Sequence, residues 1–263
     1  MSKLLEIKEL YGGYQKGVKV LRGINMHIEQ GEAVGILGLN GSGKSTLGKA
    51  VMNLLPYRSG TIIFDGQDVS AAPTHKLAKM GIAMMHQGGT VFNNLSVWQN
   101  LQLAFGIHVD KEYYNQLLEI IPLLKRPQKE LMRTMADRLS GGQRHELALA
   151  MTLARKPKLV ILDEPSAGLS PQAIREMYSN GELNQQKEIN SSAMCPKSVS
   201  QINGILVEVK QQLNISILLI EQNVSLAQSF CDRCVMLEQG RIADEFIGER
   251  LNINVIEKVM FNK

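Results

Sequence analysis

GLNGSGKST, residues 38–46, has the spacing of a peptide loop that wraps around the phosphates of a nucleotide. It matches the pattern G-x-x-x-x-G-K-[ST] in full. A short apolar run of strand type, residues 33–37, comes directly before it. After it, apolar side chains recur at helical spacing, at Leu47, Ala50, Val51, Leu54 and Leu55. The sequence therefore predicts a strand, a phosphate-binding loop and a helix in direct succession.

Each residue type in this loop has a chemical reason. Glycines at 38, 41 and 43 let the backbone turn its N–H groups inward, and the following helix directs the positive end of its dipole at the same anion. Lys44 is expected to reach the β- and γ-phosphates, and Ser45 to place a hydroxyl oxygen where Mg2+ needs a ligand. The residues expected to bind the nucleotide are Gly38, Asn40, Gly41, Ser42, Gly43, Lys44, Ser45 and Thr46.

Length and charge limit the class of protein. The chain has 263 residues, 44% of them hydrophobic, which suffices for one large α/β domain or for a domain with a smaller lobe. The formal charge of +4 comes from 29 basic and 25 acidic residues dispersed along the chain. The densest basic patch, residues 155–158, is too thin for nucleic-acid tracking, so no nucleic-acid partner is expected. A solvated loop is favoured there over weak attraction to an anionic membrane.

The sequence predicts neither a secretory segment nor a membrane span. The first eight residues alternate charged and apolar side chains, as a mature cytosolic start does. The best apolar candidate, residues 215–220, is far shorter than the roughly 18 residues that a span requires.

Three cysteines, Cys195, Cys231 and Cys234, cannot all pair with one another. The last two have C-x-x-C spacing, but no second pair or nearby histidine completes four zinc ligands. We predict buried structural thiols in preference to a metal or redox site.

Elements around the phosphate loop follow from periodicity. Residues 4–35 alternate apolar and polar positions between glycine turns, which predicts an antiparallel sheet. Further strands are expected at residues 61–64 and 82–86. Residues from about 96 to 136 lack strand signals and are predicted to be helical. We expect one domain, residues 1–263, with a helical subdomain inserted at about residues 88–138.

Two later apolar runs end in carboxylates. Residues 159–164 form an uninterrupted apolar strand that ends in Asp163 and Glu164, as a buried parallel strand does at its carboxyl edge. Residues 215–221 are a second strand of this type, and residues 234–243 indicate a hairpin. Active groups of open α/β sheets collect at the carboxyl edge, so the two acids are candidate site residues.

A second anion-binding helix start is predicted at residues 139–143, which read LSGGQ. Serine and glycine N–H groups stand there before a helix with an apolar face. The candidate residues are Ser140, Gly141, Gly142 and Gln143. Two phosphate-binding ends in one chain make sense if they serve opposite faces of a dimer.

With these motifs in this order, the chain resembles the nucleotide-binding subunit of an ATP-binding cassette (ABC) transporter along nearly its whole length. The resemblance implies an α/β fold: a three-layer P-loop ATPase core with an antiparallel β flank and an inserted helical subdomain. It implies ATP and Mg2+ as cofactors, transmembrane permease subunits as partners, and a place on the cytoplasmic face of the membrane. It also implies a second ATP-binding subunit, either a sister chain or another copy of this one.

The same resemblance assigns further residues. Tyr14 is expected to stack on adenine, with Tyr11 as the alternative. Gln87 would meet the Mg2+ ion and the attacking water, and Asp163 would hold the metal through its hydration shell. Glu164 is the candidate general base.

One departure from the wider family narrows the resemblance. Residues 218–223 read LLIEQN, so Gln222 stands where most ABC ATPases have a switch histidine. Glutamine can donate a hydrogen bond to the γ-phosphate but cannot carry charge. This motif, with GIA at residues 81–83 and VFNNLSV at residues 91–97, resembles one ATPase subunit of branched-chain amino acid importers. Urea and amide importers look similar.

The other departures follow the Asp-Glu strand. Residues 166–170 take the position of the loop that crosses the dimer interface, with Ser170 where many relatives have aspartate. Residues of about 171–196 interrupt the family pattern as an insertion. A solvated surface excursion is favoured for it over a partner-binding element.

We therefore expect the ATP-hydrolysing subunit of an importer of branched-chain amino acids or similar small polar solutes. The alternative is a cytosolic non-transport ABC ATPase of translation or DNA maintenance. Translation factors of this type have two cassettes, whereas this chain has one. DNA-maintenance relatives insert long coiled coils between the residues matching Lys44 and Asp163, which lie too close together here for such an insertion. A non-hydrolysing nucleotide sensor is disfavoured because both of these residues and Glu164 are present.

Overall fold

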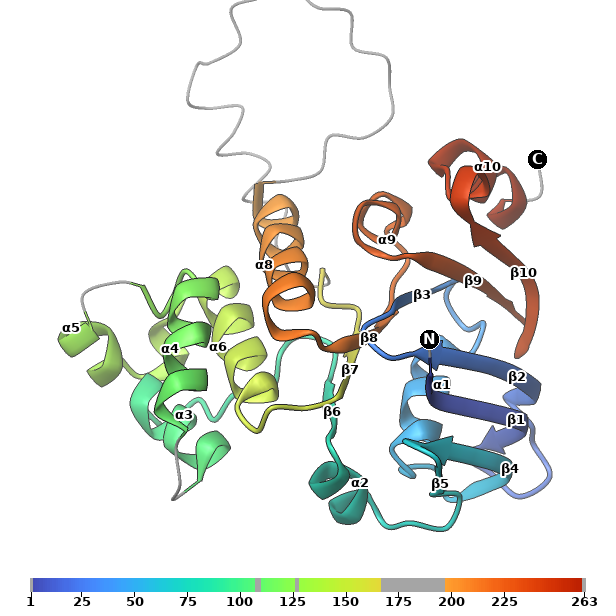
Figure 1. Ribbon diagram of the computed structural model, residues 1–263, viewed down its shortest axis with the longest axis horizontal. Coiled ribbons are helices and arrows are strands. Elements are labelled where there is room, and N and C mark those ends of the chain that lie inside the picture. Colours follow the sequence, from blue (N-terminus) through green and yellow to red (C-terminus); the bar gives the residue numbers. More distant parts are fainter. Residues whose placement is uncertain (1, 107–109, 126–127, 167–196, 262–263) are drawn as a thin grey trace, which may run out of the picture.

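Two β-sheets and a lobe of helices make up the part of the chain that the computed structural model describes, residues 2–106, 110–125, 128–166 and 197–261 (Figure 1). The larger sheet has the order β10-β9-β3-β8-β7-β6. Its strands are β3 (Ala33–Leu37), β6 (Ile82–Met85), β7 (Leu159–Asp163), β8 (Ser216–Ile220), β9 (Arg233–Glu238) and β10 (Arg241–Ile247). All pair in parallel except β10, which forms the expected hairpin with β9.

The larger sheet separates two hydrophobic cores. On β7, Leu159 and Ile161 face one core, whereas Val160 and Leu162 face the other, and none is more than 1% exposed. Successive side chains of a strand point to opposite faces, so a strand buried on both sides reads as a continuous apolar run. This is the physical origin of the apolar runs that precede the two carboxylate positions.

The smaller sheet is antiparallel, with the order β2-β1-β4-β5. Its strands are β1 (Lys3–Gly13), β2 (Leu21–Glu29), β4 (Tyr57–Phe64) and β5 (Gln67–Asp68). The prediction of one antiparallel sheet over residues 4–35 was wrong at its end, because residues 33–35 belong to β3 of the parallel sheet. Gly31, with a φ of 77°, turns the chain from one sheet into the other.

Helices and the smaller sheet cover the larger sheet on both faces. The helices α1 (Lys44–Val51) and α2 (Thr74–Met80) share one core with the smaller sheet. The other core receives side chains of α8 (Lys197–Leu213), α9 (Val224–Phe230) and α10 (Ile253–Met260), and a short helix, η2 (Gly248–Arg250), precedes α10. The result is the predicted three-layer α/β core with an antiparallel flank.

The helical lobe lies beside this core (Figure 1) and contains α3 (Val97–Phe105), α4 (Lys111–Ile120), α5 (Gln128–Arg133), η1 (Ala136–Arg138) and α6 (Gly141–Leu153). Ser96 and Ser140 begin α3 and α6 with capping boxes, in which side chain and backbone bond reciprocally. The buried Asn100 side chain donates to the carbonyls of Phe92, Leu95 and Ser96. It therefore fixes the segment that leads from the parallel sheet into the lobe.

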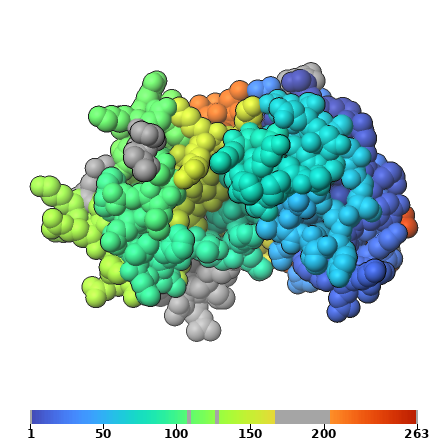
Figure 2. Space-filling view, turned by 90° about the horizontal axis from the view of Figure 1, so that it is seen from below, coloured from blue at the N-terminus to red at the C-terminus, as the bar shows by residue number. Residues whose placement is uncertain are grey.

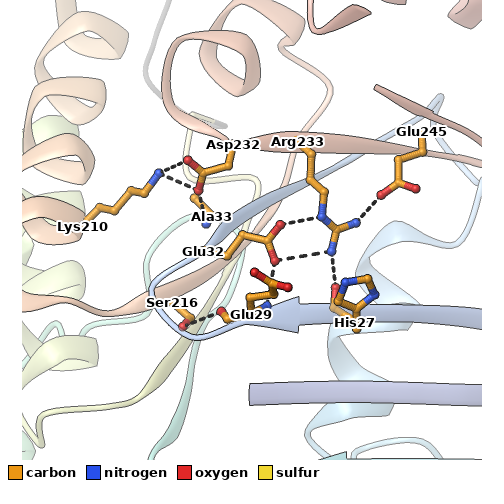
Figure 3. Close-up of polar contacts among 9 residues, drawn as sticks. All are labelled: His27, Glu29, Glu32, Ala33, Lys210, Ser216, Asp232, Arg233 and Glu245. Atoms are coloured by element: carbon orange, nitrogen blue, oxygen red, sulfur yellow. Dashed lines mark hydrogen bonds and ion pairs between the residues drawn. The ribbon is translucent and has the colours of Figure 1, made fainter. Parts of the chain in front are cut away.

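A polar cluster at the amino ends of the parallel strands ties the two sheets together (Figure 3). The Arg233 guanidinium donates to the carboxylates of Glu32 and Glu245 and to the carbonyl of His27, which lies on β2. The side chain of Arg233 is 8% exposed and that of Glu32 is 14% exposed. Removing one partner of such a pair would leave the other charge buried and unpaired, so the cluster fixes how the sheets meet.

Asp232 extends this cluster to a helix (Figure 3). Its carboxylate accepts a 2.8 Å hydrogen bond from the N–H of Ala33, the first residue of β3. It also forms an ion pair with Lys210 of α8, at 2.6 Å. The turn before β3 is also held by Ser216, whose hydroxyl accepts from the N–H of Gly31. The edge of the sheet opposite the phosphate loop is thus closed by structural contacts.

Several predictions fall outside the described residues. Cys195, the insertion at about residues 171–196 and all of the interface loop except Ser166 lie there. Cys231 and Cys234 are free and buried, as expected for structural thiols. No helix within the described ranges is long and apolar enough to cross a membrane.

Candidate active site

The carboxyl ends of β3, β8, β7 and β6 meet at one edge of the larger sheet. These strands are neighbours in that order, so the segments that follow them lie side by side. The segments carry the phosphate loop, Gln222, Glu164 and Gln87, which are far apart in the sequence. Parallel pairing thereby assembles the predicted site.

The phosphate loop depends on two glycines. A Cβ atom on Gly38 would lie 2.3 Å from the carbonyl oxygen of Leu237, so only glycine fits beside β9. Gly43 has a φ of 106° and is the N-cap of α1. No side chain caps this helix end, so the first N–H groups of α1 are available to an anion.

Lys44 is the buried cation of the site, with 4% of its surface exposed. Its ammonium group donates to the carbonyls of Gly38, at 2.9 Å, and Leu39, at 3.1 Å. Burial lowers the pKa of Lys44, while the nearby charges of Glu164, Asp163 and Glu221 act in the opposite direction. Within the described part of the chain no carboxylate forms an ion pair with it.

Ser45 and Asp163 form a pair of oxygen donors. The Ser45 hydroxyl donates to Oδ1 of Asp163 at 2.8 Å. Burial of Asp163, which is 4% exposed, raises the pKa of its carboxyl group, and the bond from Ser45 opposes this shift. A cation beside these oxygens would favour the ionised carboxylate.

These donors fit Mg2+, a hard cation that prefers oxygen ligands and is usually held by one or two carboxylates together with substrate phosphates. Among the described residues no group of three His, Cys, Asp or Glu side chains is placed to hold a metal. A metal at Ser45 and Asp163 would therefore take further ligands from the phosphates of the nucleotide.

Two amide side chains hold the Glu164 carboxylate. The amide nitrogen of Gln87 donates to Oε2 at 2.8 Å, and that of Gln222 donates to Oε1 at 2.9 Å. Gln222 also donates to Oδ1 of Asn40 in the phosphate loop, at 2.6 Å. Glu164 and Asn40 line a hollow of about 210 Å³ over the phosphate loop. Other lining residues are Val20, Gly41, Gly43, Lys44, Ser45 and Thr46.

The two candidate tyrosines have different surroundings. The hydroxyl of Tyr14 lies 3.4 Å from that of Thr46, which closes the phosphate loop, and its ring is half exposed. Tyr11 instead donates to Glu9 and has the ammonium group of Lys19 over its ring. The structure brings Tyr14, and not Tyr11, into contact with the loop.

The second predicted anion site is not part of this hollow. Residues 139–143 begin α6 in the helical lobe, whereas α1 lies on the other side of the larger sheet (Figure 1). Oγ of Ser140 accepts from the N–H of Gln143 at 3.3 Å, and the Gln143 side chain accepts from the N–H of Ser140 at 3.0 Å. One chain thus carries two separate candidate phosphate sites.

No role was assigned to Glu221 from the sequence, but this side chain lies next to the candidate site. This carboxylate is 2% exposed and accepts hydrogen bonds from the backbone N–H groups of Ser166, Gln222 and Asn223. An acid directly after an apolar strand was the available signal, since Asp163 occupies the corresponding end of β7.

This site is typical of nucleoside triphosphatases of the P-loop class. Its glycine loop opens a helix and carries a buried lysine, and a serine–aspartate pair and a further carboxylate lie beside the loop. The ABC transporter family model matches residues 21–167, and the chain belongs to this family. Members of the family bind and hydrolyse ATP. The resemblance stated from the sequence is confirmed, and the chain is an ATP-binding subunit of a transporter.

Individual relatives cover nearly the whole chain. The probable branched-chain amino acid transport ATP-binding protein LivF of Archaeoglobus fulgidus is 31% identical over 240 residues, which are 91% of this chain and 90% of LivF. The lipopolysaccharide export system ATP-binding protein LptB of Escherichia coli is 29% identical over 244 residues, 90% of this chain and 88% of LptB.

A solved structure supports the same conclusion. The cbiO1 protein of Clostridium perfringens, described as part of the ABC transporter complex cbiONQ, superposes with a TM-score of 0.72 at 27% identity. The match covers 100% of this chain and 94% of cbiO1. The names of these relatives indicate different cargoes, so the similarity by itself leaves the transported solute open.

Proposed function

We propose that this chain hydrolyses Mg2+-bound ATP at the hollow over the phosphate loop and thereby drives uptake of a branched-chain amino acid or a similar small polar solute. The observation that carries the catalytic part is the Glu164 carboxylate, held by two amide donors beside the hollow. A carboxylate there is placed to accept a proton from a water that attacks the γ-phosphate. The bond between the γ-phosphorus and the bridging oxygen then breaks, and ADP and phosphate leave.

Other residues bind and orient the substrate in this proposal. Lys44 and the free N–H groups of α1 hold the β- and γ-phosphates, so Lys44 would exchange its two carbonyl partners for phosphate oxygens. Ser45, Asp163 and Gln87 would hold Mg2+, which when bound neutralises charge developing on the phosphate oxygens. Tyr14 supplies the ring for adenine, supported by its contact with Thr46.

A second ATP-binding subunit completes the site. The Ser140 helix start stands apart from the phosphate loop of its own chain, and glycines follow it whose N–H groups favour an anion. We infer that it faces the nucleotide of a partner, which is either a sister subunit or another copy of this chain. A hydrolysis rate that rises with protein concentration would support this arrangement.

The permease subunits are proposed to dock in the groove between the lobe and the core. Figure 2 shows the lobe in green beside the core in cyan and blue, with a yellow segment between them. A groove of about 290 Å³ crosses this junction and is lined mainly by apolar side chains. Its lining residues include Met52, Ala78, Ile82, Leu103, Met151, Arg155 and Pro157. Leu103 is 55% exposed in the isolated chain, as a residue awaiting a partner would be.

Leu103→Glu tests this docking surface. A charge in an apolar interface must be desolvated without a partner, so we expect the variant to lose co-purification with the transmembrane subunits while keeping its basal ATP turnover. Ile247→Glu is the matched control, because Ile247 is 56% exposed on β10 and does not line the groove. Full co-purification of Leu103→Glu would exclude the groove as the docking surface. Identifying the subunits that co-purify with the native chain tests the importer assignment.

The proposed cargo class has two supports, the motif at residues 218–223 and the 31% identity to LivF. The named relatives are transport proteins, which favours a transporter over a cytosolic non-transport ATPase. Solute uptake by the complete transporter in vesicles, with branched-chain amino acids, urea and short amides compared, decides among the cargoes.

Gln222→His tests the role of the glutamine at the switch position. One amide group of Gln222 donates to both Asn40 and Glu164, which a neutral imidazole with a single donor cannot do. Protonation below a pKa of about 6.5 gives the imidazole two donors. We therefore expect the ratio of variant to wild-type kcat to rise as the pH falls through this region.

The control for Gln222→His adds a histidine at an exposed position of α8, as Gln211→His. Its kcat ratio should not change with pH. A pH-independent ratio for Gln222→His as well would show that position 222 does not act on the hydrolysis step.

A further inference from the structure

Glu221 is a buried carboxylate at the end of β8 that the mechanism above does not use. Its Oε1 accepts from the N–H of Ser166 at 3.0 Å, and its Oε2 accepts from the N–H groups of Gln222 at 3.0 Å and Asn223 at 3.1 Å. Burying a carboxylate is costly unless its oxygens are hydrogen-bonded. Both oxygens of Glu221 are satisfied, and they join two segments that are distant in the sequence.

One of these segments carries Glu164, and the other carries the Gln222 amide that donates to it. Ser166 follows Glu164 by two residues, and Gln222 supplies the amide that donates to Glu164 at 2.9 Å. The backbone N–H of Glu164 also donates to Ile220 at 2.8 Å, directly before Glu221. The distance between Glu164 and the Gln222 amide is therefore set by a ring of contacts that closes through Glu221.

Glu221 does not line the hollow over the phosphate loop, so it is not placed to touch the nucleotide. Its charge does act on Lys44, but the charges of Glu164 and Asp163 act on that ammonium group more strongly. Glu221 is therefore expected to contribute little to ATP binding.

We propose that Glu221 is a positioning residue, which holds the backbone of Gln222 against the turn after Glu164 so that the Gln222 amide meets the Glu164 carboxylate. This role rests on the proposed function of Glu164 and Gln222. It predicts that Glu221 affects the hydrolysis step through Gln222 and has little effect on ATP binding.

The test is a double-mutant cycle of Glu221→Gln and Gln222→Ala. A glutamine at 221 has one acceptor oxygen, so its amide nitrogen would face an N–H donor on one side of the ring. We expect kcat to fall about 10- to 100-fold, the effect of displacing a reacting group by about 1 Å, while KM changes little. The double variant should match the slower single variant within about twofold, because both changes remove the same interaction.

Glu32→Gln is the matched control, since Glu32 also accepts a backbone N–H but lies in the polar cluster at the opposite edge of the sheet. It should lower the thermal midpoint without the loss of kcat. If Glu221→Gln does not fold, as judged by circular dichroism, Glu221→Asp takes its place in the same cycle. Losses of kcat that multiply in the double variant, or a loss confined to KM, would overturn the proposal.

The cycle separates this proposal from the one it rests on. A wild-type chain without ATP hydrolysis would contradict the proposed function, and the role of Glu221 with it. Wild-type hydrolysis together with multiplied losses would overturn the role of Glu221 alone.

Discussion

ATP hydrolysis is expected to fall by about 10²–10⁴ in Glu164→Gln, the usual contribution of a positioned general base, while ATP still binds. An amide at this position cannot accept the proton of the attacking water. In the wild type the amides of Gln87 and Gln222 both donate to the carboxylate of Glu164. The amide group of the variant would face these donors with N–H donors of its own. Because the phosphate loop is untouched, the affinity for ATP should stay close to that of the wild type.

Phosphate release and equilibrium binding of a fluorescent ATP analogue measure the two effects separately. Glu249→Gln, an exposed residue of η2, is the control for loss of a carboxylate away from the site. With ATP bound and hydrolysis blocked, the variant should also elute as a dimer in size-exclusion chromatography. Normal turnover in Glu164→Gln would remove Glu164 from the role of base.

Lys44→Ala is expected to weaken ATP binding. Lys44 is 4% exposed, and a hydrogen bond from a charged donor contributes about 1.5–3 kcal/mol. Since 1.4 kcal/mol is a factor of ten, the dissociation constant of ATP should rise by about 10- to 150-fold. Lys258→Ala, on the exposed side of α10, controls for loss of one positive charge.

The two variants should differ in kind. Glu164→Gln binds ATP but does not turn it over, whereas Lys44→Ala binds ATP weakly. Unchanged affinity and turnover in Lys44→Ala would contradict the assignment of residues 38–46 as the phosphate loop.

The parts of the site that residue patterns alone predicted, without the family resemblance, are those encoded by neighbouring residues. The loop at residues 38–46 carries its own glycines, lysine and serine, and Asp163 ends an apolar run that is typical of a buried parallel strand. Pairing of such strands brings their carboxyl ends to one edge, so the meeting of Ser45 with Asp163 could be anticipated.

Hydrogen bonds that depend on the exact placement of two distant side chains were beyond prediction. The bond from Gln222 to Asn40 joins residues 182 positions apart, and that from Arg233 to Glu32 joins residues 201 apart. Neither has a local pattern, because hydrogen-bond geometry depends on how the strands are ordered. The choice between Tyr14 and Tyr11 likewise depends on which ring the turn after β1 brings to Thr46.

Short helices were also missed, for a different reason. α2 buries one residue, Leu77, and a single apolar contact gives no periodic signal. α9 has seven residues, fewer than two full repeats of an amphipathic pattern. The helical lobe was easier to anticipate, because residues from about 96 to 136 lack strand signals.

Phosphate release from ATP by the purified chain, alone and with its transmembrane partners, is the decisive measurement of Mg2+-dependent ATP hydrolysis at the phosphate loop. We expect release that requires Mg2+, stops when EDTA removes the metal, and is lost in both Lys44→Ala and Glu164→Gln. Release that persists in both variants, or no release from the wild-type chain even with its partners, would contradict this expectation.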